Sequence, residues 1–356
     1  MLQDLPVELL LGIMEKLEAI DICNLGSTCK NFHRLSLDEC LWIKIISKEF
    51  SLNVRSDANF SPKHFYKTVL YTYKSTIGLW KQTNSRYYGR LLKITAYCDS
   101  LQLQYFETPD DIGGSFKKVD FVKISYQHES NEALSQIQNL QSGSAKVSLT
   151  DAGCLTVHLC GSDDDEDSFF YKYEKLEIGL KTRLPIEEGI FLGSYGPHGI
   201  EVIQLSLPYF DNLNEAQGIK ITGDPNIPAG KVTFRVIDDK CLDMTHEEQS
   251  SMSNINEFTR NPKHIEFRED LLLDFVPPID AFNLNGDEIP FTKCVGRFNC
   301  ECQIADHDYQ NAKFIPGHFI IFNKNYFAVI FNMSNAEFAA GGAIILYRNI
   351  TKQLLI

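Results

Sequence analysis

The spacing of apolar residues changes once along the chain, and this change limits the folds that the chain can adopt. From Leu5 to about Trp80 apolar residues recur at steps of three and four, which is typical of amphipathic helices. After Trp80 they alternate with polar residues or form short β-branched and aromatic runs, as in strands. We therefore predict an α+β protein, with N-terminal helices followed by a mainly antiparallel β-barrel or sandwich.

About eleven short segments after Trp80 have this strand pattern. They cover residues 91–97, 101–106, 119–126, 146–149, 155–159, 199–207, 218–222, 231–237, 318–322, 326–333 and 343–347. Residues 247–258 have the spacing of a short helix. Because the surrounding residues 240–262 are rich in Ser, Asn and Glu, we expect them to form a surface insertion between strands.

The first helices carry more apolar surface than a unit of about 40 residues can bury by itself. Asp4 and Pro6 have the residue types of a cap and a first helical turn, and Asp21 is expected to cap the second helix. Because Leu and Ile residues would remain exposed, we expect a partner protein to cover them. The alternative is that these helices are the first hairpin of a globular core.

The order of residues in this stretch resembles an F-box, the helical motif that attaches proteins to the Skp1 adaptor of cullin-based ubiquitin ligases. The matching segments are Leu5-Pro6-x-Glu8-Leu9-Leu10, Cys29-Lys30-x-Phe32 and Leu41-Trp42. The resemblance implies an F-box in residues 1–50, a helical linker in 51–80 and a β-rich substrate-binding domain in 81–356. It also implies a set of residues that contact Skp1 or support that contact: Leu5, Pro6, Leu9, Leu10, Ile13, Leu25, Phe32 and Trp42.

Two passages rich in glycine and proline stand near the middle of the chain, at residues 189–201 and 218–230. Glycine permits positive φ and close backbone approach, and proline fixes φ, so each passage can form a rigid wall of a groove. Both passages resemble the substrate-binding domain of the F-box only protein 31 family, above all Lys220 to Gly230, with the order Lys-Ile-Thr-Gly-Asp-Pro-Asn-Ile-Pro-Ala-Gly. This resemblance implies a barrel-like domain that holds the C-terminal end of substrates, including a cyclin D tail and proteins ending in an amide, for ubiquitylation.

A chain end offers a carboxylate or a primary amide, so its recognition needs a few fixed donors and acceptors. Asp224 can accept from an amide N–H and would repel a carboxylate, whereas Lys220 and His198 favour anionic oxygen. We therefore expect Asp224 to set the selectivity. The alternative is that these side chains only satisfy backbone groups of their own turns. The predicted substrate-binding residues are Tyr195, His198, Lys220, Thr222, Asp224 and Asn226.

The sequence predicts neither a metal site nor catalytic residues. Two groups of cysteine and histidine lack the paired Cys-x2-Cys spacing of structural zinc, and we expect no cofactor. They are Cys154, His158 and Cys160, and Cys294, Cys300, Cys302 and His307. Nucleophile-elbow, phosphate-loop, dinucleotide and zinc-protease motifs are missing from the sequence. We expect a non-catalytic substrate receptor; the alternatives are a non-degradative F-box scaffold, a β-barrel peptide-binding module and, more distantly, a β-barrel hydrolase.

The net charge of −13 is a poor electrostatic match for nucleic acid or an anionic membrane surface. No apolar run reaches the ~18 residues that indicate a membrane span, and Met1 is not followed by a secretion signal. We therefore expect a cytoplasmic or nuclear protein with reduced cysteines. The five acids at residues 163–167 are expected to form a solvated loop, or else a docking patch for a basic tail. The expected partners are a Skp1-type adaptor, a cullin and substrates bound through their C-terminal tails.

Overall fold

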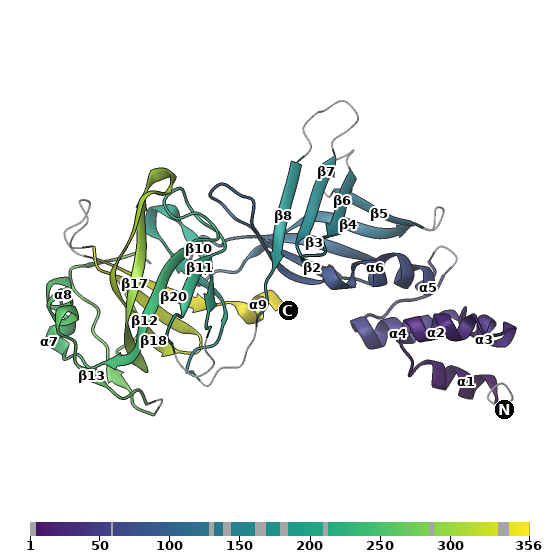
Figure 1. Cartoon of the computed structure of the whole chain (residues 1–356), viewed down its shortest axis with the longest axis horizontal. Coiled ribbons are helices and arrows are strands. Elements are labelled where there is room, and N and C mark those ends of the chain that lie inside the picture. Colours follow the sequence, from purple (N-terminus) through teal and green to yellow (C-terminus); the bar gives the residue numbers. More distant parts are fainter. Residues whose placement is uncertain are drawn as a thin grey trace. The chain divides into compact units, whose positions relative to one another are not determined.

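The structure, a computed structural model, describes residues 5–57, 60–127, 132–137, 144–160, 169–178, 184–208, 213–268, 270–284, 288–333 and 342–355. The chain forms two compact units. The first consists of Met1–Trp80, Leu92–Tyr105 and Val119–Lys175, and the second of Lys81–Leu91, Phe106–Lys118 and Leu176–Ile356. Each unit contains a closed ring of antiparallel strands (Figure 1). Apolar side chains fill the interior of each ring.

Four short helices open the first unit: α1 Val7–Met14, α2 Ala19–Gly26, α3 Lys30–Leu35 and α4 Glu39–Phe50. Asp38 caps α4, because its side chain accepts from the backbone N–H groups of Cys40 and Leu41. The expected cap at Asp21 is wrong: α2 begins at Ala19, so Asp21 lies in its first turn, where a carboxylate still favours the helix dipole. Pro6 occupies the cap position of α1, and Asp4 lies outside the described residues.

Helix α1 carries apolar side chains on two of its sides. Leu10 and Met14 are buried in the core of the first unit, with Leu10 2% exposed. Leu9 and Ile13, one helical turn apart on another side, are 56% and 42% exposed. One side of α1 therefore packs inside the chain, and the other remains uncovered.

A second helical stretch leads from these helices into the first barrel. It comprises α5 Pro62–Phe65, the π-helix η2 Tyr66–Leu70, α6 Tyr71–Tyr73 and the 3-10 turn η3 Lys74–Thr76. Ser61 caps its start by accepting from the backbone N–H of His64. Phe65, Val69 and Leu70 are fully buried in the core that α1–α4 share with the barrel. The predicted helical character up to Trp80 thus ends at Thr76, where the first strand follows.

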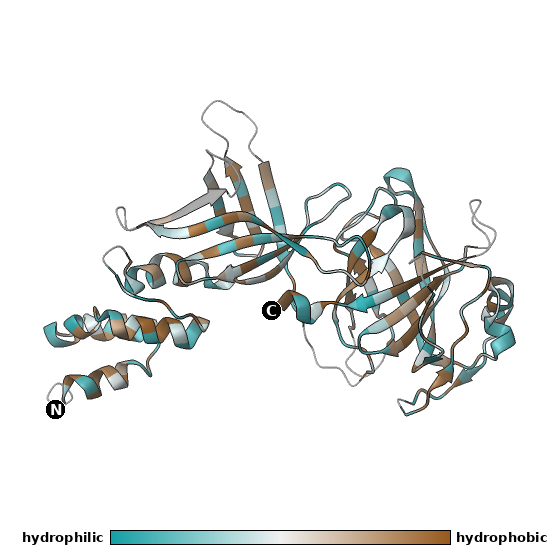
Figure 2. Cartoon of the chain, turned by 180° about the vertical axis from the view of Figure 1, so that it is seen from behind, coloured by the Kyte–Doolittle hydropathy of each residue, from teal (hydrophilic) through white to brown (hydrophobic). Residues whose placement is uncertain are grey.

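The first barrel closes with its strands in sequence order. They are β1 Gly78–Gln82, β2 Leu91–Ala96, β3 Ser100–Glu107, β4 Lys117–Gln127, β5 Glu132–Ile137, β6 Ser144–Leu149, β7 Leu155–Cys160 and β8 Phe169–Lys175. The pairing of β2 with β3 sets Ile94 opposite Leu103, and both side chains are buried. Apolar and polar residues alternate along such strands (Figure 2), because successive side chains point to opposite faces.

The second unit is also a closed ring. Its strands follow the order β11-β10-β9-β20-β19-β18-β17-β12, and the pairing of β11 with β12 joins the two ends. They are β9 Gly189–Ser194, β10 Ile200–Ser206, β11 Gln217–Lys220, β12 Val232–Leu242, β17 Gly296–Asp306, β18 Gln310–Asn323, β19 Tyr326–Phe331 and β20 Gly342–Asn349. The first glycine-rich passage is more regular than predicted, since its residues 189–194 form β9. Only the turn with η4 Gly196–His198 separates β9 from β10.

Short strands flank this ring. β13 His264–Ile265 pairs with β12, and β15 Ala281–Asn283 lies parallel to β20. β14 Leu273–Asp274 pairs with β16 Lys293–Cys294 as a separate two-stranded sheet. The 3-10 turn η5 His307–Tyr309 joins β17 to β18, and helix α9 Thr351–Leu355 follows β20.

Aromatic rings fill the second barrel. Phe234 stacks on Phe319 at 5.6 Å between ring centres, and Phe327 stacks on Tyr347 at 4.6 Å. The outer face of β18–β20 is covered by α7 His246–Gln249 and α8 Met252–Arg260. The predicted helix is confirmed in type, but a surface insertion is an incomplete description of residues 240–262: Met252, Ile255 and Phe258 are buried against the sheet.

The predicted fold class is confirmed. N-terminal helices precede mostly antiparallel barrels, and each segment predicted as a strand contains one. The domain boundaries predicted at residues 50 and 80 stay predictions. Among the described residues, no helix has both the length and the apolar character needed to cross a membrane.

The two sides of α1 predict different costs of truncation. Leu10→Ala should lower the free energy of unfolding by about 2–5 kcal/mol, because it leaves a cavity in the core. Leu9→Ala should lower it by less than about 1 kcal/mol, because its side chain is mostly in water. Urea unfolding followed by circular dichroism measures both values. Equal losses in the two variants would contradict the burial of Leu10.

Candidate functional site

A polar layer lies inside the second barrel, and Lys220 is at its centre. Glu201 points inward from β10 with Ile203 and Leu205, and Lys220 ends β11 on the inward side. Lys220 is 1% exposed and Glu201 2%. Lys220 Nζ lies 2.6 Å from Glu201 Oε2 and 2.5 Å from Asp224 Oδ2, so one ammonium lies between two carboxyl groups.

The loop after β11 holds Asp224, which is 3% exposed, in place by backbone hydrogen bonds. Its Oδ1 accepts from the N–H groups of Asn226 at 2.6 Å and Ile227 at 2.9 Å. Asn226 Nδ2 donates to the Ala305 carbonyl at 2.9 Å, which ties the loop to β17. A Cβ on Gly223 would lie 2.2 Å from the Ala229 nitrogen, so only glycine fits there. The loop is therefore rigid.

Tyr195 completes the polar layer. Its hydroxyl lies 2.6 Å from the Tyr347 hydroxyl and 3.1 Å from Thr233 Oγ1. Lys220 Nζ lies 4.1 Å from the centre of the Tyr195 ring, a cation–π distance. Burial raises the pKa of Tyr195, so the phenol stays neutral. Two kinds of group thus surround the Lys220 charge, carboxyl oxygens and a ring face, and hydroxyl groups of Tyr347 and Thr233 hold the ring in place.

The two carboxyl groups have opposite pKa shifts. Burial raises the pKa of Glu201 to about 8. Burial also acts to raise the pKa of Asp224, but the Lys220 ammonium and the hydrogen bonds from Lys220, Glu201 and the Ile227 N–H together outweigh burial and lower this pKa to about 2. At neutral pH Glu201 therefore keeps its proton, and Asp224 balances the charge of Lys220. Neither Glu201 oxygen accepts a well-formed hydrogen bond within the described chain, although Oε2 lies 2.6 Å from Nζ. A protonated carboxyl group instead donates, and the Asp224 carboxylate is within reach as acceptor.

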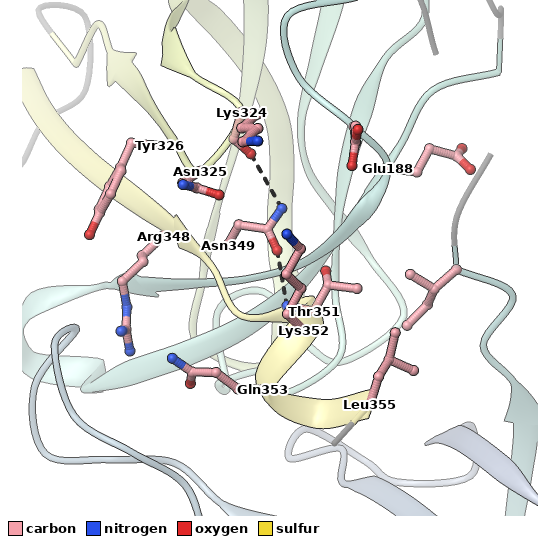
Figure 3. A pocket seen from close by; sticks show the side chains of 12 residues that line it. Glu188, Lys324, Asn325, Tyr326, Arg348, Asn349, Thr351, Lys352, Gln353 and Leu355 are labelled. Atoms are coloured by element: carbon pink, nitrogen blue, oxygen red, sulfur yellow. Dashed lines mark hydrogen bonds between the residues drawn. The ribbon is translucent and has the colours of Figure 1, made fainter. Parts of the chain in front are cut away.

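The largest of four cavities described in the second unit, about 520 Å³, is a second candidate site. Lys324, Arg348 and Lys352 line it together with Glu188 (Figure 3). Asn349 links two segments that line the cavity. Its Nδ2 donates to the Lys324 carbonyl at 3.4 Å, and its Oδ1 accepts from the Thr351 N–H at 2.9 Å. With side chains of both charges, this cavity can bind either end of a peptide. None of the predicted substrate-binding residues lines these four cavities.

The structure brings together three of the predicted substrate-binding residues, Tyr195, Lys220 and Asp224. Asn226 lies in the same loop, and Thr222 Oγ1 accepts from the Val202 N–H at 2.8 Å. His198 is apart from them, exposed in the turn after β9. Glu201 was not predicted, although its position two residues before Ile203 on a strand was a usable signal. The substrate-binding roles of all six residues stay predictions.

The predicted Skp1-contact residues divide into two groups. Pro6, Leu9 and Ile13 are exposed, whereas Leu10, Phe32 and Trp42 are buried beneath them in the core. Leu5 and Leu25 are partly buried against the same core. The exposed and partly buried residues have surface that a partner can touch, whereas the three buried ones do not, and the Skp1 roles of all eight stay predictions.

The cysteines do not form a metal site within the described residues, since no group of three or more His, Cys, Asp or Glu side chains there could hold an ion. Cys300 and Cys302 lie in the second barrel core with their sulfur atoms 3.8 Å apart. The side chain of Cys160, from the other predicted group, lies outside the described part of the chain.

Comparison with known proteins identifies both parts of the chain. An F-box-like family model matches residues 2–48, so the chain carries an F-box-like domain at its N-terminus. The family model for the cyclin D1 binding domain matches residues 173–352, slightly more than half of the 356 residues, and the chain belongs to this family.

The chain is homologous to F-box only protein 31. The proteins of Rattus norvegicus and Homo sapiens are 25% and 26% identical to it over 312 and 315 residues. These matches cover 73% of this chain, 60% of the rat protein and 56% of the human protein, so the chain spans well under two thirds of these relatives. A shorter match, 39% identical over 72 residues, links 16% of the chain to 11% of Protein EXECUTER 2, chloroplastic, of Arabidopsis thaliana.

The protonated state of Glu201 predicts a specific pH dependence of stability. The folded protein holds this proton up to about pH 8, whereas the unfolded chain releases it near the ordinary pKa of 4.5. The contribution of Glu201 to the free energy of unfolding therefore falls as the pH rises between these values. Glu201→Gln removes the titration, so between pH 5 and pH 8.5 the variant should gain on the order of 3 kcal/mol relative to the unmodified protein.

Urea unfolding at pH 5, 7 and 8.5 measures this difference. The control is Glu257→Gln, which changes an exposed carboxylate on α8 and should follow the unmodified protein at each pH. A Glu201→Gln curve parallel to the unmodified one would show that Glu201 is ionised in the folded state.

Proposed function

We propose that this protein is a substrate-recognition subunit of an SCF ubiquitin ligase. It docks on Skp1 through the F-box and holds the C-terminal tails of substrates, free or amidated, in the second barrel for ubiquitylation and proteasomal degradation. The observation that carries the proposal is an F-box-like segment with an uncovered apolar side, in a chain that also contains a cyclin D1 binding domain. The chain itself performs no catalysis, and it acts in the cytoplasm or nucleus.

The adaptor face consists of the exposed apolar residues of the first two helices. Val7, Leu9, Ile13 and Ile20 are all exposed in a chain of net charge −13. Single exposed apolar residues are common on proteins, but a group of them on two consecutive helices favours an interface. Burying a large aliphatic side chain contributes roughly 1.5–3 kcal/mol, so four of them supply much of a stable contact.

The tail site is assigned to the polar layer of the second barrel and its loop at residues 221–231. Lys220 favours an anionic oxygen, and Asp224 favours an amide N–H, so the pair can distinguish the two kinds of chain end. A rigid loop suits this task because it spends no entropy on ordering when the tail binds. Because Asp224 is only 3% exposed, a tail reaches it only if residues next to the loop move aside.

The alternatives make different demands on the two sites. A non-degradative scaffold binds Skp1 and a partner but supports no ubiquitin transfer, and a peptide-binding module needs no adaptor face. Substrate ubiquitylation in a reconstituted ligase with Skp1 and a cullin separates them. The proposal requires that ubiquitin transfer to the substrate falls both when the α1 face is changed and when the Asp224 loop is changed. If only one of these two changes lowers transfer, the result favours one of the alternatives.

Truncating the exposed side of α1 should weaken adaptor binding without unfolding the protein. Leu9→Ala combined with Ile13→Ala should lower the affinity for Skp1 by about 2 kcal/mol or more, close to thirtyfold, because both side chains would be buried in the complex. Isothermal titration with purified Skp1 measures this. The control is Ile279→Ala, which removes an exposed aliphatic side chain of the second unit and should bind normally. Undiminished binding by the double variant would rule out the α1 face as the contact.

Asp224→Asn should shift the preference between chain ends. The variant no longer repels a carboxylate at this position, so binding should move toward carboxylate-ended peptides by about tenfold. Fluorescence anisotropy with matched peptides that end in an amide or a carboxylate measures the ratio. Lys352→Ala, in the 520 Å³ cavity, should leave the ratio unchanged. If only Lys352→Ala changes it, the tail site is that cavity instead.

A further inference from the structure

Arg297 is a buried cation on the outer side of the second barrel, and no described carboxylate pairs with it. It lies in β17 next to Phe298, whose side chain fills the barrel interior, so Arg297 points to the opposite face. Its side chain is 2% exposed. The titratable neighbours that act on the pKa of Arg297 are the thiols of Cys294 and Cys300, and no carboxylate is among them. Burial lowers the pKa of Arg297 to about 10, which leaves the guanidinium charged at neutral pH.

Two neutral side chains fix the guanidinium group in one orientation. Nε donates to His318 Nδ1 at 2.8 Å, and Nη1 donates to Gln249 Oε1 at 3.0 Å. Burial and the Arg297 charge lower the pKa of His318, so its ring is neutral and Nδ1 accepts. The other ring nitrogen lies 3.2 Å from Thr259 Oγ1 on α8. Gln249 is held in turn by its donations to the Met244 and Asp274 carbonyls.

The remaining nitrogen, Nη2, is buried and has no hydrogen-bond partner in the described part of the chain. Arg297 and Gln249 line a cavity of about 200 Å³. Leu242, Met244 and Cys294 form its walls, and burial raises the pKa of the Cys294 thiol to about 12, so the thiol carries no charge. A buried charge without a counter-charge is strongly unfavourable, and a fixed guanidinium edge matches a carboxylate.

We propose that this cavity is a binding site for a carboxylate group, received by the Nη2 edge of Arg297. The carboxylate belongs either to a small organic acid or to a peptide. The site is separate from the Glu201–Lys220–Asp224 layer, because that layer faces the barrel interior, and it does not depend on the function proposed above.

Two aspartates at the cavity set limits on the ligand. Asp274 is already paired with Lys293, and its Oδ2 lies 3.2 Å from His246 Nε2. Asp243 is exposed, and none of the described ion pairs joins it to a basic side chain. Asp243 therefore opposes a second negative charge, so the cavity should take a monocarboxylate in preference to a dicarboxylate.

The test compares butyrate with butyramide, which has nearly the same shape and no charge. Butyrate should raise the thermal unfolding midpoint of the full chain in proportion to its concentration, at ionic strength held constant with sodium chloride, and butyramide should not. Arg297→Gln should abolish the response. Leu272→Asp keeps the core intact, because Leu272 is an exposed residue that lines the cavity. The added negative charge should lower the affinity for butyrate about tenfold.

Leu271→Asp is the matched control: it adds the same charge at the neighbouring exposed leucine, which is not among the lining residues, and should respond like the unmodified protein. Asp243→Asn should strengthen butyrate binding, because it removes a like charge. The proposal fails if butyrate and butyramide act equally, if Leu272→Asp and Leu271→Asp behave alike, or if Asp243→Asn weakens binding.

Short peptides identify the source of the carboxylate. Gly-Gly-Leu with a free C-terminus is compared with its amide, and acetyl-Gly-Glu-Gly-amide with its Gln counterpart. Binding of the acidic member of either pair, tighter than butyrate and lost in Arg297→Gln, assigns the site to a peptide. Butyrate binding that depends on Arg297 without peptide binding assigns it to a small acid. Nuclear magnetic resonance of the Arg297 Nε–H signal locates the contact in both cases.

Discussion

The ammonium group of Lys220, buried inside the second barrel, is the interaction on which the geometry of the candidate tail site depends. Removing such a charge from water costs several kcal/mol, and only well-placed partners offset this cost. Asp224 and Glu201 supply oxygens at 2.5 and 2.6 Å, and Tyr195 supplies a ring face. Because Asp224 also accepts from two backbone N–H groups of its loop, the same ion pair fixes the loop against the end of the barrel.

The first unit solves a different problem with its helices. Its core needs Leu10 and Met14 from α1, yet Leu9 and Ile13 remain in water. A helix with apolar residues around most of its circumference gains stability from one neighbour and keeps a second side for another. Under the proposed function, folding of the first unit and binding of the adaptor therefore use different residues of α1. Mutations can affect one without the other, which is what an adaptor-binding segment needs.

Much of the local structure was predictable from the sequence, because period-two and helical spacing are local properties. The pairing partners of each strand were not predictable, since the strands of both rings share the same local pattern. Leu9 and Leu10 are adjacent and chemically identical, so only the packed structure shows that one is exposed and the other buried. Glu201 was missed because a single carboxylate in a strand usually faces water. Arg297 is not part of a motif, and its side-chain neighbours, His318 on β18 and Gln249 on α7, are distant in the sequence.

Lys220 and Arg297 are both buried cations of the second unit, but only Lys220 has a carboxylate partner within the described chain. Lys220 faces the interior and is matched within the chain by an ionised Asp224, so its burial needs nothing else. Arg297 faces outward, donates to neutral acceptors and keeps one buried nitrogen without a hydrogen-bond partner in the described chain, and its side chain lines a cavity. The same energetic rule applies to both charges, and the chain satisfies it from its own residues in only one case. For Arg297 no described residue supplies a negative charge, so the proposed carboxylate comes from outside the described chain, through the cavity that Arg297 lines.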